Sequence, residues 1–590
     1  GKGSGGRLHY QVKVPAHART TLWIAVTGSE TGSGSAVNEQ ASVLRDPEAL
    51  LRRKVAARAR LQRFTRLSLP GDRLLQRGVD WSKQNLADSL QAATDLDLRE
   101  ANSGKNYPPP AGKVARARWI AAGFPDYPWL FATDGEYTAF ASVAAGQFAP
   151  IKDHLKALRD VSEIVNKGSG KVVHEVVSDG AVYFGSNADA GNTDETVKFP
   201  SAVALVWRWT GDNRFRDDLY GFSVRNMRYV FDQLDADHDG WPEGLGNVER
   251  PGMGEEKLDV SVYAIRGLRD LADMARSKGD TATVTWAEGR ARAMEAAFEN
   301  AWWLPNVPQH ADSLRNPTNE KVMQRHWIGV TPMEAELVHG AGRPAPGLTT
   351  RDHAIAALTL REQGCFGNAA GLFHTGSGGC DPAPSSKSDL EIFSLNSAVM
   401  AVGEGNYGRL GPGQQQRFTR ANRQLQLPAP DEEPGAMPEI APSPDYGRSI
   451  EKSFLERASV LQAWGAYGTV WPVVHQQLGV RPDMGRGKLE VTPQVPSNQH
   501  GIAGRGIRVG TGSMDVVAGH RGKRYETRVR TRADLFQLRL GVTLPAGSNV
   551  RSATLDGKRA SYRTRVTNRG LEVLVRARPF GGHKLVVKAR

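Results

Sequence analysis

The side chains of this 590-residue sequence with the clearest chemical potential are carboxylates that stand beside aromatic residues. They occur in three loops: Trp129 with Asp134, Trp241 with Glu243, and Glu439 ahead of Trp464. An aromatic ring can stack on the C–H face of a sugar, while a carboxylate accepts hydrogen bonds from its hydroxyls. The pattern predicts a sugar site. The alternative for each loop is a core tryptophan beside a helix-capping acid.

The second loop offers a candidate proton donor. Glu243 follows Trp241 and lies between Pro242 and Gly244, so partial desolvation would raise its pKa and keep it protonated as a general acid. Glu439 lies in a similar proline-rich loop and could meet Glu243 as the general base. Rival acids in the second loop are Glu249, Glu255, Glu256 and Asp259.

The second loop also begins with three alternating aspartates, Asp235, Asp237 and Asp239, which imitate the start of an EF-hand. The twelfth position holds Gly246 in place of the bidentate glutamate. A capped turn is therefore the preferred interpretation, and a calcium site of another kind the lesser one. We expect no cofactor. The sequence also lacks the G-x-S-x-G, H-E-x-x-H, P-loop and strand-coupled G-x-G-x-x-G signatures.

Composition sets the class of protein. The chain is 39% apolar and 24% charged, and no apolar run approaches the roughly 18 residues of a membrane span. The net charge of +13 is concentrated in residues 521–590, where 18 Lys or Arg face four acidic residues. Arg528, Arg530 and Arg532 alternate as on a solvated strand face, which we favour over a polyanion-binding surface. We expect no nucleic-acid partner.

The elements that must position the three loops change along the chain. Residues 1–46 contain β-rich runs that predict the end of an N-terminal β-domain, and residues 47–73 a linking helix. Apolar residues at steps of three and four, such as Ile151, Leu155 and Leu158, predict helices through residues 74–480. That length, with long loops, favours a closed toroid of paired helices that collects functional loops at one end. Residues 481–590 alternate as the strands of a β-sandwich.

The two cysteines, Cys365 and Cys380, stand in a glycine-rich stretch. A lone close pair predicts a disulfide and therefore a secreted protein, and the alternative is two buried thiols. The first residue is Gly1, which suggests a processed or trimmed chain.

Taken together, the loops resemble those of glycoside hydrolases built on an (α/α)6 barrel, especially the amylo-α-1,6-glucosidase (glycogen-debranching) group and, more distantly, glucoamylases and α-L-rhamnosidases. The resemblance rests on W-L-F-A-T-D-G-E-Y (129–137), K-V-V-H-E-V (171–176), N-T-D-E-T (192–196), W-R-W-T-G-D (207–212), D-G-W-P-E-G-L-G (239–246), E-K-L-D-V-S-V-Y (256–263), M-P-E-I (437–440) and Q-A-W-G-A-Y (462–467). It implies Glu243 as the acid and Glu439 as the base. It also implies sugar-binding roles for Trp129, Asp134, His174, Glu175, Asp194 and Trp464.

The resemblance implies an inverting, exo-acting hydrolase of α-linked glucosyl oligosaccharides or polysaccharides. The alternatives are an α-L-rhamnosidase or another glycosidase of a bacterial polysaccharide, a phosphorylase or lyase on the same toroid, and a non-catalytic protein that binds carbohydrates or polyanions. The family often carries Q-A-W-S-A where this chain has Q-A-W-G-A at 462–466, so the substrate stays open.

Overall fold

The structure is a computed structural model. It describes residues 7–29, 32–185, 193–340, 343–344, 346–377, 389–426, 435–441 and 459–590. The chain divides into two compact units, Gly1–Gln62 and Arg63–Arg590. Among the described helices, none has the length and apolar character that crossing a bilayer requires.

The first unit is helical where the sequence predicts the end of a β-domain. Helices α1 (Ser33–Arg45) and α2 (Pro47–Gln62) follow an extended segment, and no strand is assigned within residues 7–29. Leu8 and Ile24 of this segment are exposed. A strand needs a partner for its backbone groups and a face to bury its side chains, and the described part of this unit supplies neither. The helix predicted from Pro47 is present as α2.

Six helices of the second unit contact one another in cyclic order, with the last contacting the first. They are α4 (Ala132–Ala145), α6 (Asp194–Thr210), α8 (Leu258–Lys278), α10 (Thr331–Glu334), α12 (Ser394–Asn406) and α14 (Tyr467–Trp471). We call them the inner helices. Every residue of α4 and of α12 is buried, which suits helices that are covered on all sides.

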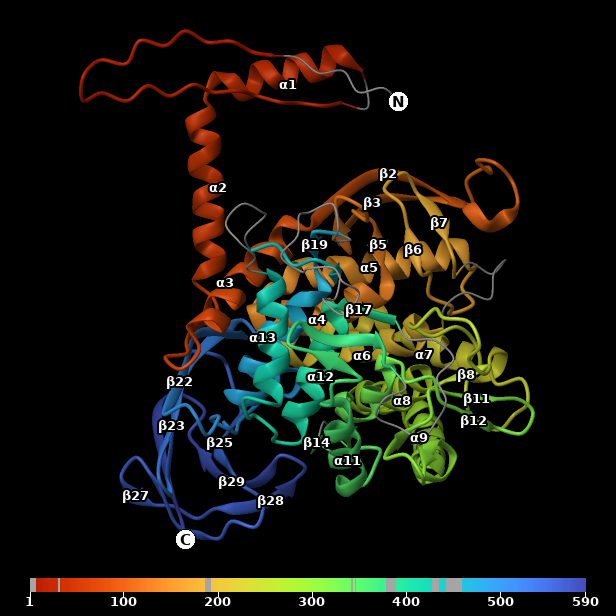
Figure 1. Ribbon diagram of the computed structural model, residues 1–590, viewed down its shortest axis with the longest axis vertical. Coiled ribbons are helices and arrows are strands. Elements are labelled where there is room, and N and C mark those ends of the chain that lie inside the picture. Colours follow the sequence, from red (N-terminus) through yellow and green to blue (C-terminus); the bar gives the residue numbers. More distant parts are fainter. Residues whose placement is uncertain are drawn as a thin grey trace. The chain divides into compact units, whose positions relative to one another are not determined.

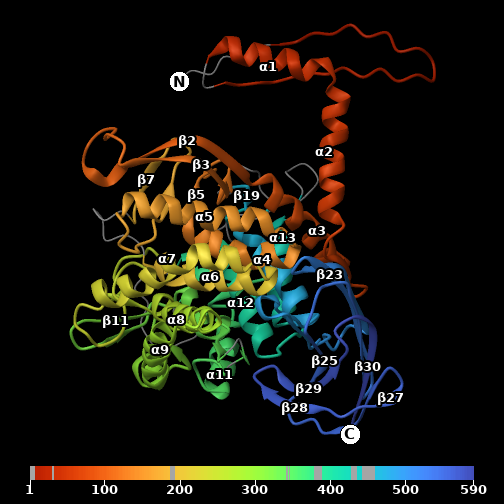
Figure 2. The same cartoon turned by 180° about the vertical axis from the view of Figure 1, so that it is seen from behind.

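Each inner helix packs against an outer helix. The outer helices, in the order of their inner partners, are α5 (Phe148–Val165), α7 (Asn213–Gln233), α9 (Thr281–Trp302), α11 (Arg351–Arg361), α13 (Gln415–Gln426) and α3 (Arg73–Asp88). The apolar residues predicted from periodicity on α5, including Ile151, Leu155 and Leu158, are buried. Asp212 and Asp280 cap α7 and α9 through the backbone N–H groups of Phe215 and Thr283. Figures 1 and 2 show the helices of the second unit from two sides.

The C-terminal residues form strands of two sheets, as their alternating pattern predicts, and the first sheet also takes in a strand that precedes the inner helices. One sheet has the order β1 (Arg66–Ser68), β22 (Gly501–Val509), β23 (Gly512–Arg521), β24 (Arg524–Thr531), β30 (Gly581–Ala589), β26 (Val550–Leu555) and β27 (Lys558–Arg559). The other has the order β20 (Val480–Asp483), β21 (Lys488–Val491), β25 (Gln537–Leu544), β29 (Gly570–Ala577) and β28 (Arg563–Thr567). On β24, Arg528 and Arg530 are exposed while Val529 and Thr531 are buried, so the basic residues follow the strand period. The strands of residues 501–590 are blue in Figures 1 and 2.

Short strands that the sequence pattern did not reveal fix the starts of the inner helices. Strands β5 (Leu130–Phe131), β8 (Glu256–Lys257), β17 (Asp389–Phe393) and β19 (Leu461–Gln462) lead into α4, α8, α12 and the turn Trp464–Ala466. The sheets that contain these four strands also include β6 (Glu175–Val176), β7 (Ala181–Tyr183), β2 (Leu90–Glu100), β3 (Gly112–Ile120), β11 (Ser313–Arg315), β12 (Glu320–Val322), β15 (Gly367–Asn368), β16 (Gly371–Thr375), β18 (Ile440–Ala441) and β4 (Gly123–Phe124). Two further pairs are β9 (Trp303–Leu304) with β10 (Gln309–His310) and β13 (Val338–His339) with β14 (Arg343–Pro344).

Candidate active site

Buried acidic residues begin three neighbouring inner helices. Asp134, Asp194 and Asp259 lie in the first turns of α4, α6 and α8. The free N–H groups and the positive dipole end of a helix stabilise carboxylates at this position. Asp194 is already committed in part, because Lys198 Nζ lies 2.7 Å from its Oδ2 and Thr133 donates a hydrogen bond of 2.5 Å. Both contacts go to Oδ2, whereas Oδ1 has no partner among the described residues, so the sugar-binding role of Asp194 stays a prediction.

Asp134 is held toward its neighbours by Gln462, whose Nε2 donates a hydrogen bond of 2.5 Å to Asp134 Oδ1. Burial raises the pKa of Asp134 well above its usual range, the negative charge of Glu439 raises it further, and His174 opposes the shift. Asp134, Glu439 and His174 are therefore near enough to interact electrostatically.

Glu439 is fixed by its backbone between two elements. Its N–H donates to Ser459 O at 3.1 Å, and its carbonyl accepts from Ser394 N, at the start of α12, at 2.9 Å. Burial raises the pKa of Glu439 to about 7, with further contributions from the negative charges of Glu249 and Asp126. A carboxyl group with a pKa near the operating pH suits general acid–base catalysis.

His174 joins two of the surrounding acids. Its Nδ1 hydrogen-bonds Glu195, and its Nε2 lies 3.9 Å from Glu249 Oε1. Burial lowers the pKa of His174, but Glu195, with a contribution from Glu249, outweighs that effect and raises the pKa to about 10. His174 is consequently a cation at neutral pH. The side chain of Glu249 is 55% exposed, so it can meet a ligand from solvent.

A cluster of aromatic rings adjoins these charges. Trp129 stacks on Phe131 with ring centroids 6.0 Å apart and on Tyr183 at 6.5 Å, and Tyr127 packs edge-on against Trp129 at 5.7 Å. Trp129 is half-buried and Tyr183 is exposed. Burial, followed by the charge of Glu439, raises the pKa of Tyr127, which places the cluster close to that carboxylate. Rings presented in this way can stack on sugars.

Sequence reasoning missed Tyr127 and Asp126, although the run F-P-D-Y-P ahead of Trp129 repeats the signal of an acid beside an aromatic ring. Glu175, a predicted sugar ligand, is next to His174 on β6, and burial raises its pKa. Trp464 is buried, and its Nε1 finds no hydrogen-bond partner in the described ranges.

Glu243 interacts with a different set of residues. Its Oε1 accepts a hydrogen bond of 2.8 Å from Asn316 Nδ2, and its backbone bridges to Glu256. Burial raises the pKa of Glu243, and the acids that add to this shift are Asp237 and Asp235. Among the acids of the second loop, Glu249 therefore contributes to the raised pKa of Glu439, and Glu243 is not among the charges that do so. Trp241 is 4% exposed and packs edge-on against Trp302 at 5.7 Å, which makes it a core residue rather than a sugar platform.

The carboxylate oxygens of Asp235, Asp237 and Asp239 lie within 4.8 Å of one another. Several of them already accept hydrogen bonds: Asp235 from Gly240 N at 3.1 Å, and Asp239 from Asn319 Nδ2 at 2.5 Å. These contacts fit the capped turn preferred from the sequence. The calcium alternative stays a prediction.

Cys365 is buried, and Cys380 lies outside the described residues. The disulfide between them and the secreted location therefore stay predictions.

No family model matches the chain, and no curated protein matches its sequence. Solved structures do resemble it. A GH78 family rhamnosidase of Bacillus sp. GL1 has a TM-score of 0.56 at 14% identity, covering 82% of this chain and 43% of that one. A structure named sialidase has a TM-score of 0.53 at 14% identity, with coverage of 81% and 41%. The α-L-rhamnosidase of Streptomyces avermitilis, solved with L-rhamnose, has a TM-score of 0.50 at 14% identity, with coverage of 89% and 42%.

The chain thus spans less than half the length of these proteins, at identities that establish a likeness of fold alone. The predicted resemblance to helical glycoside hydrolases is confirmed at that level.

Proposed function

We propose that the chain is an inverting glycoside hydrolase on an (α/α)6 toroid spanning about residues 74–480, between the linking helix and the β-sandwich. The observation that carries the proposal is Glu439, a carboxyl group with a pKa of about 7 that senses the charge of an exposed second carboxylate, Glu249. The half-buried aromatic cluster at Trp129 gives the pair a surface for a sugar ring.

In the proposed reaction, Glu439 is the general base and removes a proton from a water molecule. Glu249 is the general acid and protonates the glycosidic oxygen as that bond breaks. The water attacks the opposite face of the sugar through an oxocarbenium-like transition state, which inverts the anomeric carbon and requires carboxyl groups roughly 6.5–9.5 Å apart. His174 Nε2 lies 3.9 Å from Glu249 Oε1, close enough to help hold this side chain in position.

Glu243, the acid predicted from the sequence, is the competing proton donor. Matched variants separate the two: Glu249→Gln is expected to lower kcat/KM by about 10²–10⁴-fold, and Glu243→Gln by far less. The reverse order would restore Glu243 as the acid. Equal and small losses would contradict both assignments.

The leaving group adds an independent test. An aryl glycoside with an acidic phenol needs little protonation, so Glu249→Gln should lose much less activity on it than on an alkyl glycoside. Glu439→Gln should lose activity on both, because water activation is needed in each case. If Glu249→Gln lost the same fraction of activity on the aryl and the alkyl glycoside, Glu249 would not be the general acid.

For the substrate we propose an α-L-rhamnoside, supported by the rhamnosidases among the structural neighbours. The α-glucoside expected from the sequence resemblance is the second candidate. Incubation with matched rhamnosyl and glucosyl oligosaccharides, with the first anomer released followed by NMR, reports the sugar and the stereochemistry together. Release of the retained anomer would refute the inverting mechanism.

A binding protein without catalysis is the competing function, and exposed arginines on the β-sandwich, such as Arg528 and Arg530, favour considering it. It predicts salt-sensitive binding to polyanions without release of reducing sugar.

A further inference from the structure

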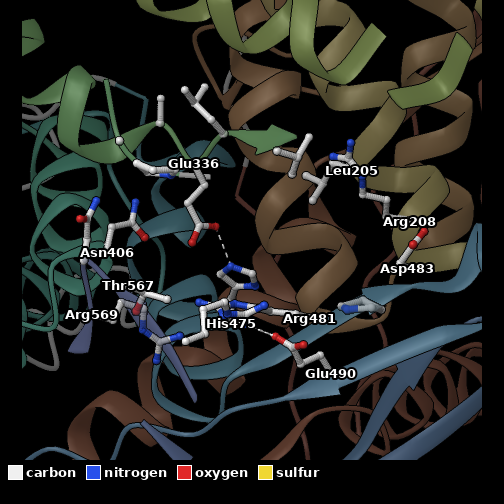
Figure 3. Close-up of a pocket in the computed structure, with 18 of the residues that line it drawn as sticks. Leu205, Arg208, Glu336, Asn406, His475, Arg481, Asp483, Glu490, Thr567 and Arg569 are labelled. Carbon is white, nitrogen blue, oxygen red and sulfur yellow. Dashed lines mark hydrogen bonds and ion pairs between the residues drawn. The ribbon is translucent and has the colours of Figure 1, made fainter. Parts of the chain in front are cut away.

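A cavity of about 1000 Å³ lies at the opposite ends of the inner helices from the candidate active site. Its walls include the last turns of α6 and α12, the segment after α14, and residues from the second sheet of the β-sandwich. Figure 3 shows Asn406, His475 and Arg569 among the side chains around it.

The lining is strongly basic. Among the described residues it contains eight arginines and one lysine, against three acidic residues, Glu336, Asp483 and Glu490. Most of these charges are paired inside the protein. Arg481 lies 2.7 Å from Glu572, and His475 lies 2.6 Å from Glu336, a contact drawn in Figure 3. Charges that are paired within the protein do not by themselves indicate a ligand.

Two buried donors in the lining differ from the rest. Arg569 is 5% exposed, and its Nε and Nη2 donate to Gln494 Oε1 and Gln476 O, whereas its Nη1 has no partner in the described part of the chain. Tyr407 is 3% exposed, and its hydroxyl likewise has none among the described atoms. Buried donors are rarely left without an acceptor, because the desolvation of such a group is not repaid.

Tyr407 directly follows α12, and the turn that holds Arg569 comes close to it through the neighbouring residue Asn568. A Cβ atom placed on Gly347 would lie 2.6 Å from Tyr407 Oη and 3.3 Å from Asn568 Nδ2, so these two polar groups are within about 6 Å of each other. Asn568 immediately precedes Arg569 in the turn between β28 and β29. Burial, and next the charge of Arg481, lowers the pKa of Arg569 to about 10, the direction expected for a desolvated cation in basic surroundings. The charges of Glu572 and Glu336 oppose this shift, and a bound anion would act in the same direction as they do.

The cavity also has an apolar wall. Trp471 lines it and stacks on His475 with ring centroids 4.1 Å apart. Ligand pockets of about 300–1000 Å³ commonly combine such a wall with a few convergent polar groups.

We propose that this cavity binds an organic anion, whose carboxylate or phosphate group accepts hydrogen bonds from Arg569 Nη1 and the Tyr407 hydroxyl. The site is separate from Glu439 and its neighbours, and the proposal does not rest on the proposed hydrolysis. Ligands of either kind are small molecules that fit the cavity and carry a compact anionic group.

The test is isothermal titration of the full chain with citrate, inorganic phosphate and glucuronate at fixed ionic strength, with glucose as the neutral match for glucuronate. We expect saturable binding of at least one anion and none of glucose. Citrate and phosphate distinguish a carboxylate ligand from a phosphate ligand. Absence of saturable binding by all three anions, or equal binding of glucose and glucuronate with no binding of the other two, would overturn the proposal.

Variants locate the binding. Tyr407→Phe removes a hydroxyl without a described partner, so the fold should persist while anion affinity falls about tenfold. Arg569→Lys keeps the charge but loses the planar fork, and it should weaken binding at least as much. Tyr562→Phe, at an exposed tyrosine, is the matched control. If Arg569→Lys fails to fold, Tyr407→Phe decides, and unchanged affinity in that variant would refute the assignment.

Discussion

Replacing Glu439 with glutamine should stabilise the protein at alkaline pH while it removes the proposed base. The fold raises the pKa of this carboxyl group from its ordinary value of 4.5 to about 7. The native state therefore favours the protonated form, and the stability that this preference contributes is complete below pH 4.5 and is lost as the pH rises through 7. At about 1.4 kcal/mol per pKa unit, the loss amounts to as much as about 3 kcal/mol at pH 8.

Glutamine remains neutral at every pH, so Glu439→Gln avoids this loss. Urea unfolding followed by tryptophan fluorescence at pH 4 and pH 8 measures the effect. We expect nearly equal free energies of unfolding for variant and parent at pH 4, and a variant more stable by up to about 3 kcal/mol at pH 8. Glu48→Gln, at an exposed glutamate of α2, is the control variant. If the difference in free energy of unfolding between variant and parent were the same at pH 4 and pH 8, the fold would not raise the pKa of Glu439, and the argument would be refuted.

Further predictions concern the same end of the inner helices. Lys198→Met leaves Asp194 buried without its cation and should lower the free energy of unfolding by about 3–5 kcal/mol, whereas Lys156→Met, at a surface ion pair, should cost no more than about 1 kcal/mol in the same urea assay. Trp129→Ala should raise KM more than it lowers kcat, because the proposed role of the ring is to contact the sugar and not the reacting bond; a purely structural tryptophan would instead lower the unfolding midpoint. With Glu439 as the base, kcat/KM should rise about tenfold per pH unit below pH 7 and then level off, and a limb centred near pH 4.5 would contradict the pKa of about 7.

The elements with a repeating pattern could be predicted from the sequence. Helix α5 is covered on one face, so Ile151, Leu155 and Leu158 repeat at steps of three and four and are buried. Strand β24 alternates because one face packs into the sandwich and the other carries arginines. Helix α4 is buried on every side and has no polar face, so its sequence predicts a helix but does not show which way each face of the helix points.

The second carboxylate of the proposed pair with Glu439 was harder to predict, because neighbouring acids in a loop can point in different directions. Between Glu243 and Glu249 the backbone passes through left-handed conformations, at Gly244 with φ of 129° and at Glu249 itself with φ of 52°. Glu243 consequently meets Asn316 and the aspartate turn, while Glu249 meets His174. Two acids only six residues apart in the sequence therefore have different contacts, and only the folded backbone shows which contacts each one makes.

The orientation of the inner helices sorts the charges of the second unit. Asp134 and Asp259 lie in first turns, where free N–H groups stabilise anions, whereas Arg208 and Arg276 lie in last turns, where free carbonyls stabilise cations. The N-terminal ends therefore gather the carboxylates that acid–base chemistry needs. The arginines at the C-terminal ends are already paired, Arg208 with Asp270 and Asp273 and Arg276 with Glu288, so an anion in the cavity depends on a donor from outside the helices, which Arg569 of the β-sandwich provides. Loss of the donor Arg569 should therefore abolish anion binding, while the carboxylates at the N-terminal ends of the inner helices remain unchanged.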